Sequence, residues 1–361
     1  MALYCIYVAC FWVATQQEDG SDAERLVAFG GAAIGGVGAG FLWTAQGAYF
    51  AMAADEHAHH LQQDVSTSTA SLAGRFAFLY LAEEVVLRVL STVLVGILSW
   101  ESIFGLYTAI TVVSTLCMPF VYNYPPSTDD AATTSTIFYK VTAAGQLLWK
   151  DPKMKYMIGL NAVFGFASAF LNSYVNGQVV PIALVNGERY IGVLSSWVSA
   201  VAAGMSLVFG RLGRLGKGPI LLLGACCFLG VVFPFVVQPD ASHYGWGLLI
   251  LVYTFHGIGR ATFEGTLKAT FADYFPYEKE GAFANIILQN GLSGAIGYFC
   301  KYNQLLYCCH WRRWHESVAD TNLVRDETFL ILTHTHLSYF DVPSFHSDVQ
   351  LALRHTKSLL H

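Results

Sequence analysis

Charged side chains are scarce in this sequence, in which Asp, Glu, Lys and Arg together make up 12% of 361 residues. Hydrophobic residues make up 54%, and the mean hydropathy is +0.45. Soluble domains carry about 25% charged residues, which keep their surface in water. The 20 basic and 25 acidic side chains are too few to cover a soluble protein of this length. The composition therefore excludes an ordinary soluble fold and indicates a chain surrounded by lipid.

Several motifs that carry chemistry are also missing. The sequence has no basic stripe interleaved with aromatic residues, so we predict no nucleic-acid partner. It has no P-loop and no GxSxG elbow, which excludes the usual signatures of an ATP-driven pump and of a serine hydrolase. We therefore predict that the protein is not an enzyme and that it needs no cofactor.

Two clusters contain metal-competent side chains but lack a recognised ligand spacing. Residues 55–60 have no HExxH arrangement, and we interpret them as a solvated loop. The second cluster lies in the polar C-terminal tail and matches no zinc pattern. We predict no metal site at either. The clusters comprise Asp55, Glu56, His57, His59 and His60, and Cys308, Cys309, His310 and His315.

Long apolar runs are what the sequence does have. A helix needs about 20 predominantly apolar residues to cross a bilayer, and nine segments come near that length. We therefore predict an all-α, polytopic, integral membrane protein whose first partner is the lipid bilayer. The predicted spans are residues 2–14, 26–53, 73–99, 103–122, 154–180, 191–210, 219–237, 244–258 and 281–300.

The first two spans have particular features. No positively charged region precedes the apolar core of residues 2–14, so this segment fails as a signal peptide and reads as a span that starts abruptly. In the second span, Gly31 and Gly35, and then Gly36 and Gly40, are four residues apart. This spacing places small residues on one helical face, where another backbone can approach closely.

The composition changes sharply between residues 124 and 153, where prolines, aspartates and a Ser/Thr cluster indicate a linker. It divides residues 1–123, with about four spans, from residues 154–300, with about five. Cytoplasmic loops carry an excess of Lys and Arg, and alternation of the spans gathers most basic residues on the side of the linker. We therefore predict that the linker and Met1 are cytoplasmic. The basic residues on this side are Lys140, Lys150, Lys153, Arg211, Arg214, Lys217, Lys268 and Lys279.

Residues 301–361 break this pattern, because they are rich in His and Arg and contain no span. One interpretation is a genuine soluble tail. The other is a misjoined exon or frameshift that has replaced a last helix, so that the segment is non-native or disordered. We favour the second interpretation.

Ionisable residues within a span are costly and are functional-site hypotheses by default. Glu84 and Arg88 are four apart and can neutralise each other, whereas Glu83 is turned about 100° away. One interpretation is a proton or cation site in a cavity. The other, of equal weight, is a self-satisfied pair and a carboxylate near the lipid headgroups. Arg260 and Glu264 are also four apart, and we expect them to form an ion pair that pins a loop.

Amide side chains gather in two of the spans. They could line a path for a solute or hold neighbouring helices together through interhelical hydrogen bonds, and we favour the second role. These amides are Asn161, Asn172 and Asn176 in one span, and Gln289 and Asn290 in the last.

Four stretches resemble the uncoordinated-ninety-three-like (Unc-ninety-three) branch of the major facilitator superfamily. Residues 40–49 resemble its fourth span, residues 210–217 its basic loop between spans eight and nine, and residues 256–276 and 280–285 its entry into span eleven. The residues that carry these motifs are Trp43, Gln46, Gly47, Arg211, Arg214, Gly257, Arg260, Glu264, Asp273, Glu280 and Asn285.

The resemblance implies an incomplete two-bundle fold with about nine of twelve spans, in which spans one, two and twelve are missing. It also implies solute or ion transport, regulation of a potassium channel, or escort of receptors through the secretory system. The expected partner is then a small solute or ion, or another membrane protein. If the protein transports, we expect Glu83 and Glu84 to be coupling carboxylates and Asn172 and Gln289 to line the cavity.

Overall fold

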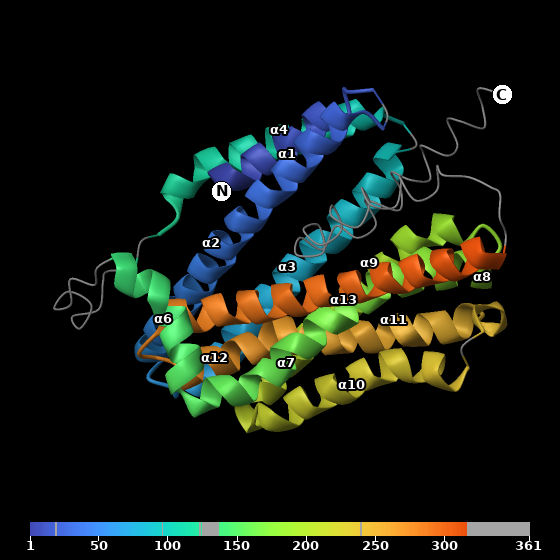
Figure 1. The fold of residues 1–361 in the computed structure, drawn as a ribbon. Coiled ribbons are helices and arrows are strands. Elements are labelled where there is room, and N and C mark those ends of the chain that lie inside the picture. The colour runs from blue at the N-terminus through green and yellow to red at the C-terminus, as the bar shows by residue number, and fades with distance from the viewer. Residues whose placement is uncertain (19, 96, 123, 125–136, 239, 316–361) are drawn as a thin grey trace.

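A computed structural model describes residues 1–315 except 19, 96, 123, 125–136 and 239 (Figure 1). Helices make up the secondary structure of these residues, and no strand occurs among them. The all-α prediction is therefore confirmed for the described part of the chain.

The first helices are α1 (Ala2–Ala14), α2 (Asp22–Leu61), α3 (Val65–Val95) and α4 (Trp100–Cys117). A further helix, α6 (Ile137–Lys150), leads into a continuous run of α7 (Pro152–Ala169), the π-helix η2 (Phe170–Val179) and α8 (Val180–Ala183). Next come α9 (Ile191–Leu212), the 3-10 turn η4 (Gly213–Leu215) and α10 (Gly218–Val237). The last run joins α11 (Trp246–Ala261), the π-helix η6 (Thr262–Leu267) and α12 (Lys268–Tyr274), and α13 (Lys279–His315) follows it.

Apart from α6, which matches no predicted span, nine helical runs within the described ranges follow the order of the nine predicted spans. Five of them are long and apolar enough by themselves to cross a membrane. The middle of α3 is more polar, because it carries Glu83, Glu84 and Arg88. The five are Asp22–Leu61, Trp100–Phe120, Pro152–Ala183, Ile191–Leu212 and Gly218–Val237.

The structure corrects one predicted loop. Residues 55–60 are not a solvated loop, because α2 continues as a helix through Leu61. Ala54 and Ala58 are buried on one side of this last stretch. Asp55 forms an ion pair with Lys279, and His60 hydrogen-bonds Glu56 at 3.1 Å.

Two further boundaries differ from the prediction. The run that begins with α11 does not end near residue 258 but continues through η6 and α12 to Tyr274. Likewise, α13 continues through His315, so the predicted start of the tail at residue 301 lies inside a helix. Residues 316–361, and the side chains of the second cluster of metal-competent residues, lie outside the described residues.

The contacts between helices fall into two groups, and α2 and α3 take part in the contacts that join the groups. α1 packs against α2 and α4, α7 packs against α13, and α10 packs against α11. α3 lies along α9 and also contacts η6 and α12, while α2 reaches α13 (Figure 1). Helices from before and after residues 124–153 therefore share an extensive contact.

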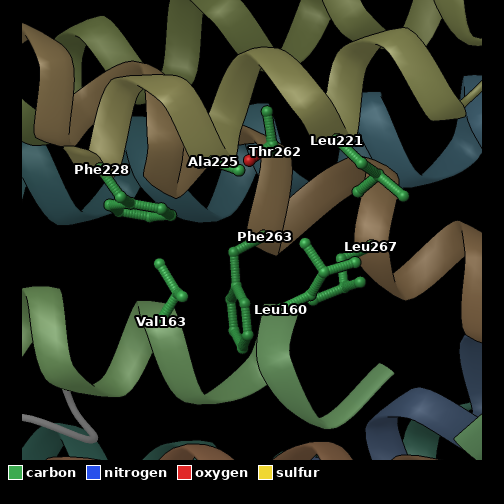
Figure 2. Close-up of a pocket in the computed structure, with 8 residues that line it drawn as sticks. All are labelled: Leu160, Val163, Leu221, Ala225, Phe228, Thr262, Phe263 and Leu267. Carbon is green, nitrogen blue, oxygen red and sulfur yellow. The ribbon is translucent and has the colours of Figure 1, made fainter. Parts of the chain in front are cut away.

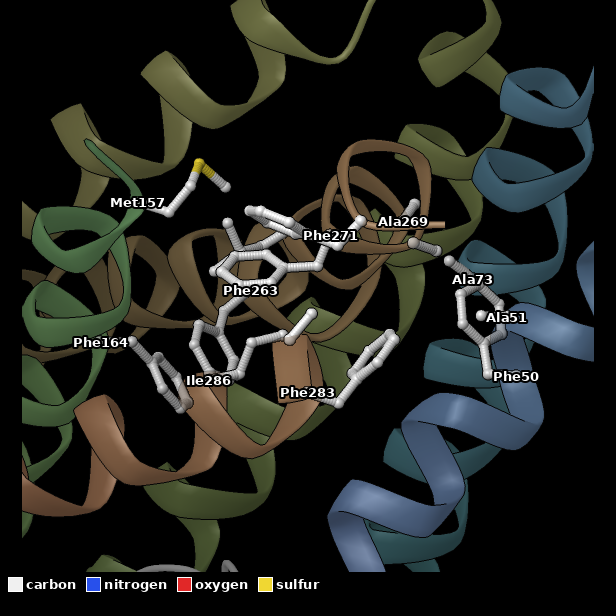
Figure 3. Close-up of a cluster of buried hydrophobic side chains, with 14 of the residues drawn as sticks. Phe50, Ala51, Ala73, Met157, Phe164, Phe263, Ala269, Phe271, Phe283 and Ile286 are labelled. Carbon is white, nitrogen blue, oxygen red and sulfur yellow. The ribbon is translucent and has the colours of Figure 1, made fainter. Parts of the chain in front are cut away.

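The largest buried cluster lies where these helices meet (Figure 3). It joins Phe50 of α2 to Phe164 of α7 and Phe283 of α13. The rings of Phe164 and Phe263 stack with centroids 3.9 Å apart. This apolar core gives the charged groups described below a fixed scaffold.

Glycines allow the closest helix contacts. Gly31 of α2 faces Cys10 of α1, where an added Cβ would lie 2.6 Å from the Cys10 Cβ. Gly35 faces Tyr7 of α1, whereas Gly40 has open space at its Cα. Gly74 of α3 and Gly210 of α9 face each other, and a Cβ on Gly74 would lie 2.6 Å from the Gly210 Cα. The predicted close packing therefore holds for Gly31 and Gly35 but not for Gly40.

Polar contacts tie several connections together at one end of the bundle. Lys217, which precedes α10, forms an ion pair with Asp273 of α12 and donates to Thr69 Oγ1 of α3 at 2.8 Å. Partial burial lowers the pKa of the Lys217 ammonium, and the Asp273 carboxylate opposes that change. These connections between helices, which carry basic residues, thus lie at the same end of the bundle, as the alternation of spans requires. The cytoplasmic position of that end stays a prediction.

Candidate functional site

A buried network of charged side chains joins α3 to α9 and α11. The Glu84 carboxylate accepts hydrogen bonds from Ser199 Oγ at 2.6 Å and from Arg260 Nη1 at 3.0 Å. Arg260 Nη2 lies 2.5 Å from the second carboxylate oxygen, so the guanidinium binds with both terminal nitrogens. Such forked pairs combine a strong attraction with a defined orientation. One carboxylate therefore holds three helices together.

Arg88 completes this network from the next turn of α3. It forms an ion pair with Glu84, as the spacing of four residues predicts. The exposed fraction is 8% for Glu84, 4% for Arg88 and 1% for Arg260. Charges removed from water to this extent are costly unless they are paired. We define the Glu84 cluster as Glu84, Arg88, Ser199 and Arg260.

The predicted ion pair of Arg260 with Glu264 at a loop is wrong. Arg260 lies inside the bundle and binds Glu84, whereas Glu264 Oε2 binds Lys268 Nζ at 2.6 Å. Lys268 is 7% exposed and lies 5.0 Å from the centre of the Trp43 ring, so it is not a loop residue either. The prediction failed because this helix continues beyond residue 258 and carries these side chains into the core.

The π-helix η6 lies between Arg260 and Lys268. Its wider turn changes the direction of the side chains that follow it, and π-helical turns in proteins are frequently found at functional sites. Close packing positions the preceding turns of α11, because a Cβ on Gly257 would lie 2.8 Å from the Val198 carbonyl oxygen. The local sequence thus allows α11 to lie directly on α9, within reach of Glu84.

Glu83 lies apart from the Glu84 cluster. It is on the exposed side of α3, and no ion pair or hydrogen bond to it is found among the described residues. The predicted difference in direction between Glu83 and Glu84 is therefore observed.

The buried amides form interhelical contacts. Asn161 Nδ2 donates to Gln289 Oε1 at 2.7 Å, which connects α7 to α13. Gln289 Nε2 lies 3.4 Å from Asn285 Oδ1, and Asn285 donates to the Ala144 carbonyl of α6 at 2.8 Å. In the π-helix η2, Asn176 Nδ2 donates to Asn172 Oδ1 at 3.3 Å. Tyr253 of α11 donates its hydroxyl to Asn176. Asn290 is half-buried.

The other residues of the four family-like stretches differ in their burial and contacts. Gly47 is buried against the ring of Phe283, and Trp43 packs edge-on against Tyr80 with centroids 5.5 Å apart. Gln46 is half-buried, and Arg211 and Glu280 are exposed. The side chain of Arg214 lies outside the described residues.

Sequence reasoning missed Ser199 and His256, and it placed Lys268 among the basic residues of the connections, whereas this side chain is buried. Ser195, Ser199 and Ser206 recur at spacings of four and seven, which could have indicated a polar face on α9. His256 is 4% exposed and packs against the rings of Phe164 and Phe228. Its Nδ1 has no hydrogen-bond partner among the described residues. No sequence signal distinguished this histidine from its apolar neighbours.

A pocket in the described part of the chain lies between α7, α10 and the α11–α12 run (Figure 2). Its empty volume is about 290 Å³, including space open to the outside. The predicted cavity residues Asn172 and Gln289 do not line it, and most of its surface is apolar. The lining residues are Leu160, Val163, Leu221, Ala225, Phe228, Thr262, Phe263 and Leu267.

Two known proteins of the same name are similar in sequence to part of this chain. The chain is 25% identical to Protein unc-93 homolog A of Bos taurus over 203 residues, which are 55% of this chain and 43% of that protein. It is 24% identical to the Mus musculus protein of the same name over 165 residues, or 45% of this chain and 34% of that protein. The matched regions thus span less than half of each relative. No solved structure matches the chain significantly.

The model of one family covers most of the sequence. The Major Facilitator Superfamily matches residues 1–298, which include the helices described above except the last part of α13. The predicted similarity to the Unc-ninety-three branch is confirmed by the two relatives. The chain is therefore an integral, multi-pass membrane protein that belongs to the Major Facilitator Superfamily.

Proposed function

We propose that the protein moves a small solute or ion across the membrane, and that α3 shifts against α9 and α11 during transport. The observation that supports this is the Glu84 cluster, in which one carboxylate on α3 binds a serine on α9 and an arginine on α11. Buried charges within a membrane protein often mark a substrate or ion path. Secondary transporters move one group of helices against another around a central site.

In this proposal the Glu84 cluster holds the closed arrangement. Arg260 is oriented by both Glu84 and Ser199, with Nη1 3.2 Å from Ser199 Oγ. Separation of α3 from α9 and α11 would break three hydrogen bonds and leave charges without partners. A substrate or ion that binds these groups in the open arrangement would compensate for that loss.

The experiment is a flux measurement with the purified protein in phospholipid vesicles. Transport currents are recorded after steps in H⁺, Na⁺, K⁺, Cl⁻ and a panel of small organic ions. We expect a current for the wild type and at least a tenfold loss in Glu84→Gln, because the amide cannot pair with both arginines. Glu101→Gln changes an exposed carboxylate at the start of α4 and is the control. Absence of flux from the wild type would contradict the proposal.

A second candidate function is that of a non-transporting partner, which regulates a potassium channel or escorts receptors. It is favoured by the bonding of Asn161 to Gln289 and of Tyr253 to Asn176, because these amides then hold helices together rather than line a path. Its test is the current of a co-expressed potassium channel, or the surface level of a co-expressed receptor, with and without the protein. A change in either, without flux in vesicles, would support this function over transport.

A further inference from the structure

One face of α3 is apolar, exposed and interrupted by a single carboxylate. Leu79, Val86, Leu90 and Val93 are between 40% and 66% exposed, and Glu83 lies among them. With Glu83 included, successive positions are separated by four, three, four and three residues. This is the spacing of a seam along which a second helix packs. We define the Glu83 seam as Leu79, Glu83, Val86, Leu90 and Val93.

Glu83 lies near the middle of the membrane-spanning region. The neighbouring Glu84 binds Ser199, the ninth residue of the 22-residue α9. At 1.5 Å per residue, Ser199 is about 12 Å from the start of α9 and about 20 Å from its end. α9 is itself long and apolar enough to cross a bilayer. Glu83, one residue from Glu84, is therefore at a depth where lipid would offer only hydrocarbon.

A carboxylate in hydrocarbon is costly, by about 2.5 to 3.5 kcal/mol on insertion scales, and residues of this kind pair with one another or with polar groups. Glu83 has no such partner among the described residues. Its neighbours on the same face are the apolar residues Leu79, Val86 and Leu90, so this face is not suited to line a water-filled cavity. A group that satisfies Glu83 would therefore lie on a helix outside the described residues.

We infer that the Glu83 seam is the docking surface for a membrane-spanning helix of a partner protein that carries a lysine or arginine halfway along its apolar run. The basic side chain pairs with Glu83, and the apolar side chains pack along the seam. A second copy of this chain fits less well, because a twofold contact through the seam would bring two Glu83 carboxylates together. This inference goes beyond transport and does not depend on it.

The experiment uses the full chain in phospholipid vesicles with model helices. Each model helix is a leucine- and alanine-rich membrane-spanning peptide with lysine, leucine or glutamate at its central position. Binding is measured by energy transfer between dyes on the protein and on the peptide. We expect the lysine peptide to bind at least tenfold more tightly than the leucine peptide, and the glutamate peptide to bind no better than leucine.

Variants identify the group responsible. Glu83→Gln and Glu83→Leu should remove the preference for lysine, whereas Glu101→Gln should retain it. Circular dichroism checks that each variant keeps its helix content. Equal binding of the three peptides would overturn the inference, and so would a lysine preference that survives Glu83→Leu. A Glu83→Leu variant that changes only self-association would instead identify a second copy as the occupant. Flux plays no part in this measurement, so its result is separate from the test of transport.

Discussion

Arg260 of α11 binds Glu84 of α3 across 176 positions of sequence, and both side chains are buried. The pair joins a helix before residues 124–153 to one after them. Its contribution to stability leads to the first prediction.

Removal of Glu84 should destabilise the protein more than removal of Arg260. Glu84→Met leaves Arg88 and Arg260 without their shared carboxylate, and loss of one partner from a buried ion pair costs about 3 to 5 kcal/mol. Arg260→Met should cost less, because Glu84 retains Arg88 and Ser199. The free energy of unfolding in mixed micelles measures both, with Glu101→Gln, which changes an exposed carboxylate, as a control that we expect to be neutral. Equal losses for Glu84→Met and Arg260→Met would contradict this account.

The close contact of α3 with α9 predicts a strong effect at Gly74. Gly74→Ala places a Cβ 2.6 Å from the Gly210 Cα and 2.7 Å from the Ser206 carbonyl oxygen, so the two backbones must separate. We expect a loss of about 1 to 3 kcal/mol, typical of overpacking. Gly204→Ala is the matched control, because Gly204 is also helical and has open space at its Cα. That variant should be neutral or slightly more stable, since alanine favours helix. A stable Gly74→Ala protein would mean that the helices are less closely packed than described.

The hydrogen bond between Asn161 and Gln289 should make a measurable contribution to the contact of α7 with α13. Interhelical hydrogen bonds in membranes contribute about 0.6 kcal/mol on average and up to about 1.7 kcal/mol. A double-mutant cycle with Asn161→Ala and Gln289→Ala measures the coupling free energy of this pair. Gln146→Ala, which changes an exposed amide on α6, replaces Gln289→Ala in a control cycle. We expect coupling only in the first cycle, and its absence there would show that the two amides act independently.

The contact of Tyr277 with Asp151 should depend on pH. Partial removal of the Tyr277 phenol from water, together with its bond to Asp151, raises its pKa to about 12. The same bond lowers the pKa of the Asp151 carboxyl from its ordinary value of 3.8. A raised tyrosine pKa contributes stability below pH 10.0 that is lost as the pH rises through about 12. A lowered aspartate pKa contributes stability above pH 3.8 that is lost on acidification.

Tyrosinate absorbance checks this expectation. Subtraction of the titration of Tyr277→Phe from that of the wild type isolates one phenol, which should titrate near pH 12. Asp151→Asn should move this titration toward pH 10.0, because the charged acceptor is lost. If the isolated phenol titrated at its ordinary pKa in the wild type, the bond to Asp151 would not form in solution.

The long helices could be predicted because each apolar run must be as long as the bilayer is thick. The pairing of Glu84 with Arg88 could be predicted for a similar reason, since it lies within one helix and depends only on spacing. The ends of helices were harder to predict. Residues 55–60 are polar in composition, yet they are helical, and the burial of Ala54 and Ala58 supports that helix. Local sequence does not contain that support.

The contacts between distant segments could not be predicted. Arg260 has an acidic neighbour four residues away in Glu264, yet it binds Glu84 on another helix. Which carboxylate Arg260 binds depends on the packing of α11 against α9 and on the π-helix η6, and neither feature follows from side-chain spacing. Ser199 was missed for the same reason, because a serine in an apolar helix becomes significant only when a carboxylate reaches it.

The long contact between α3 and α9 has a consequence for how the protein could be assembled. The two helices belong to opposite sides of residues 124–153, and their glycines, charges and hydroxyl groups contact one another directly. Two separate polypeptides, divided within residues 125–136 and produced in the same cell, would then recognise each other in the bilayer and purify as one particle.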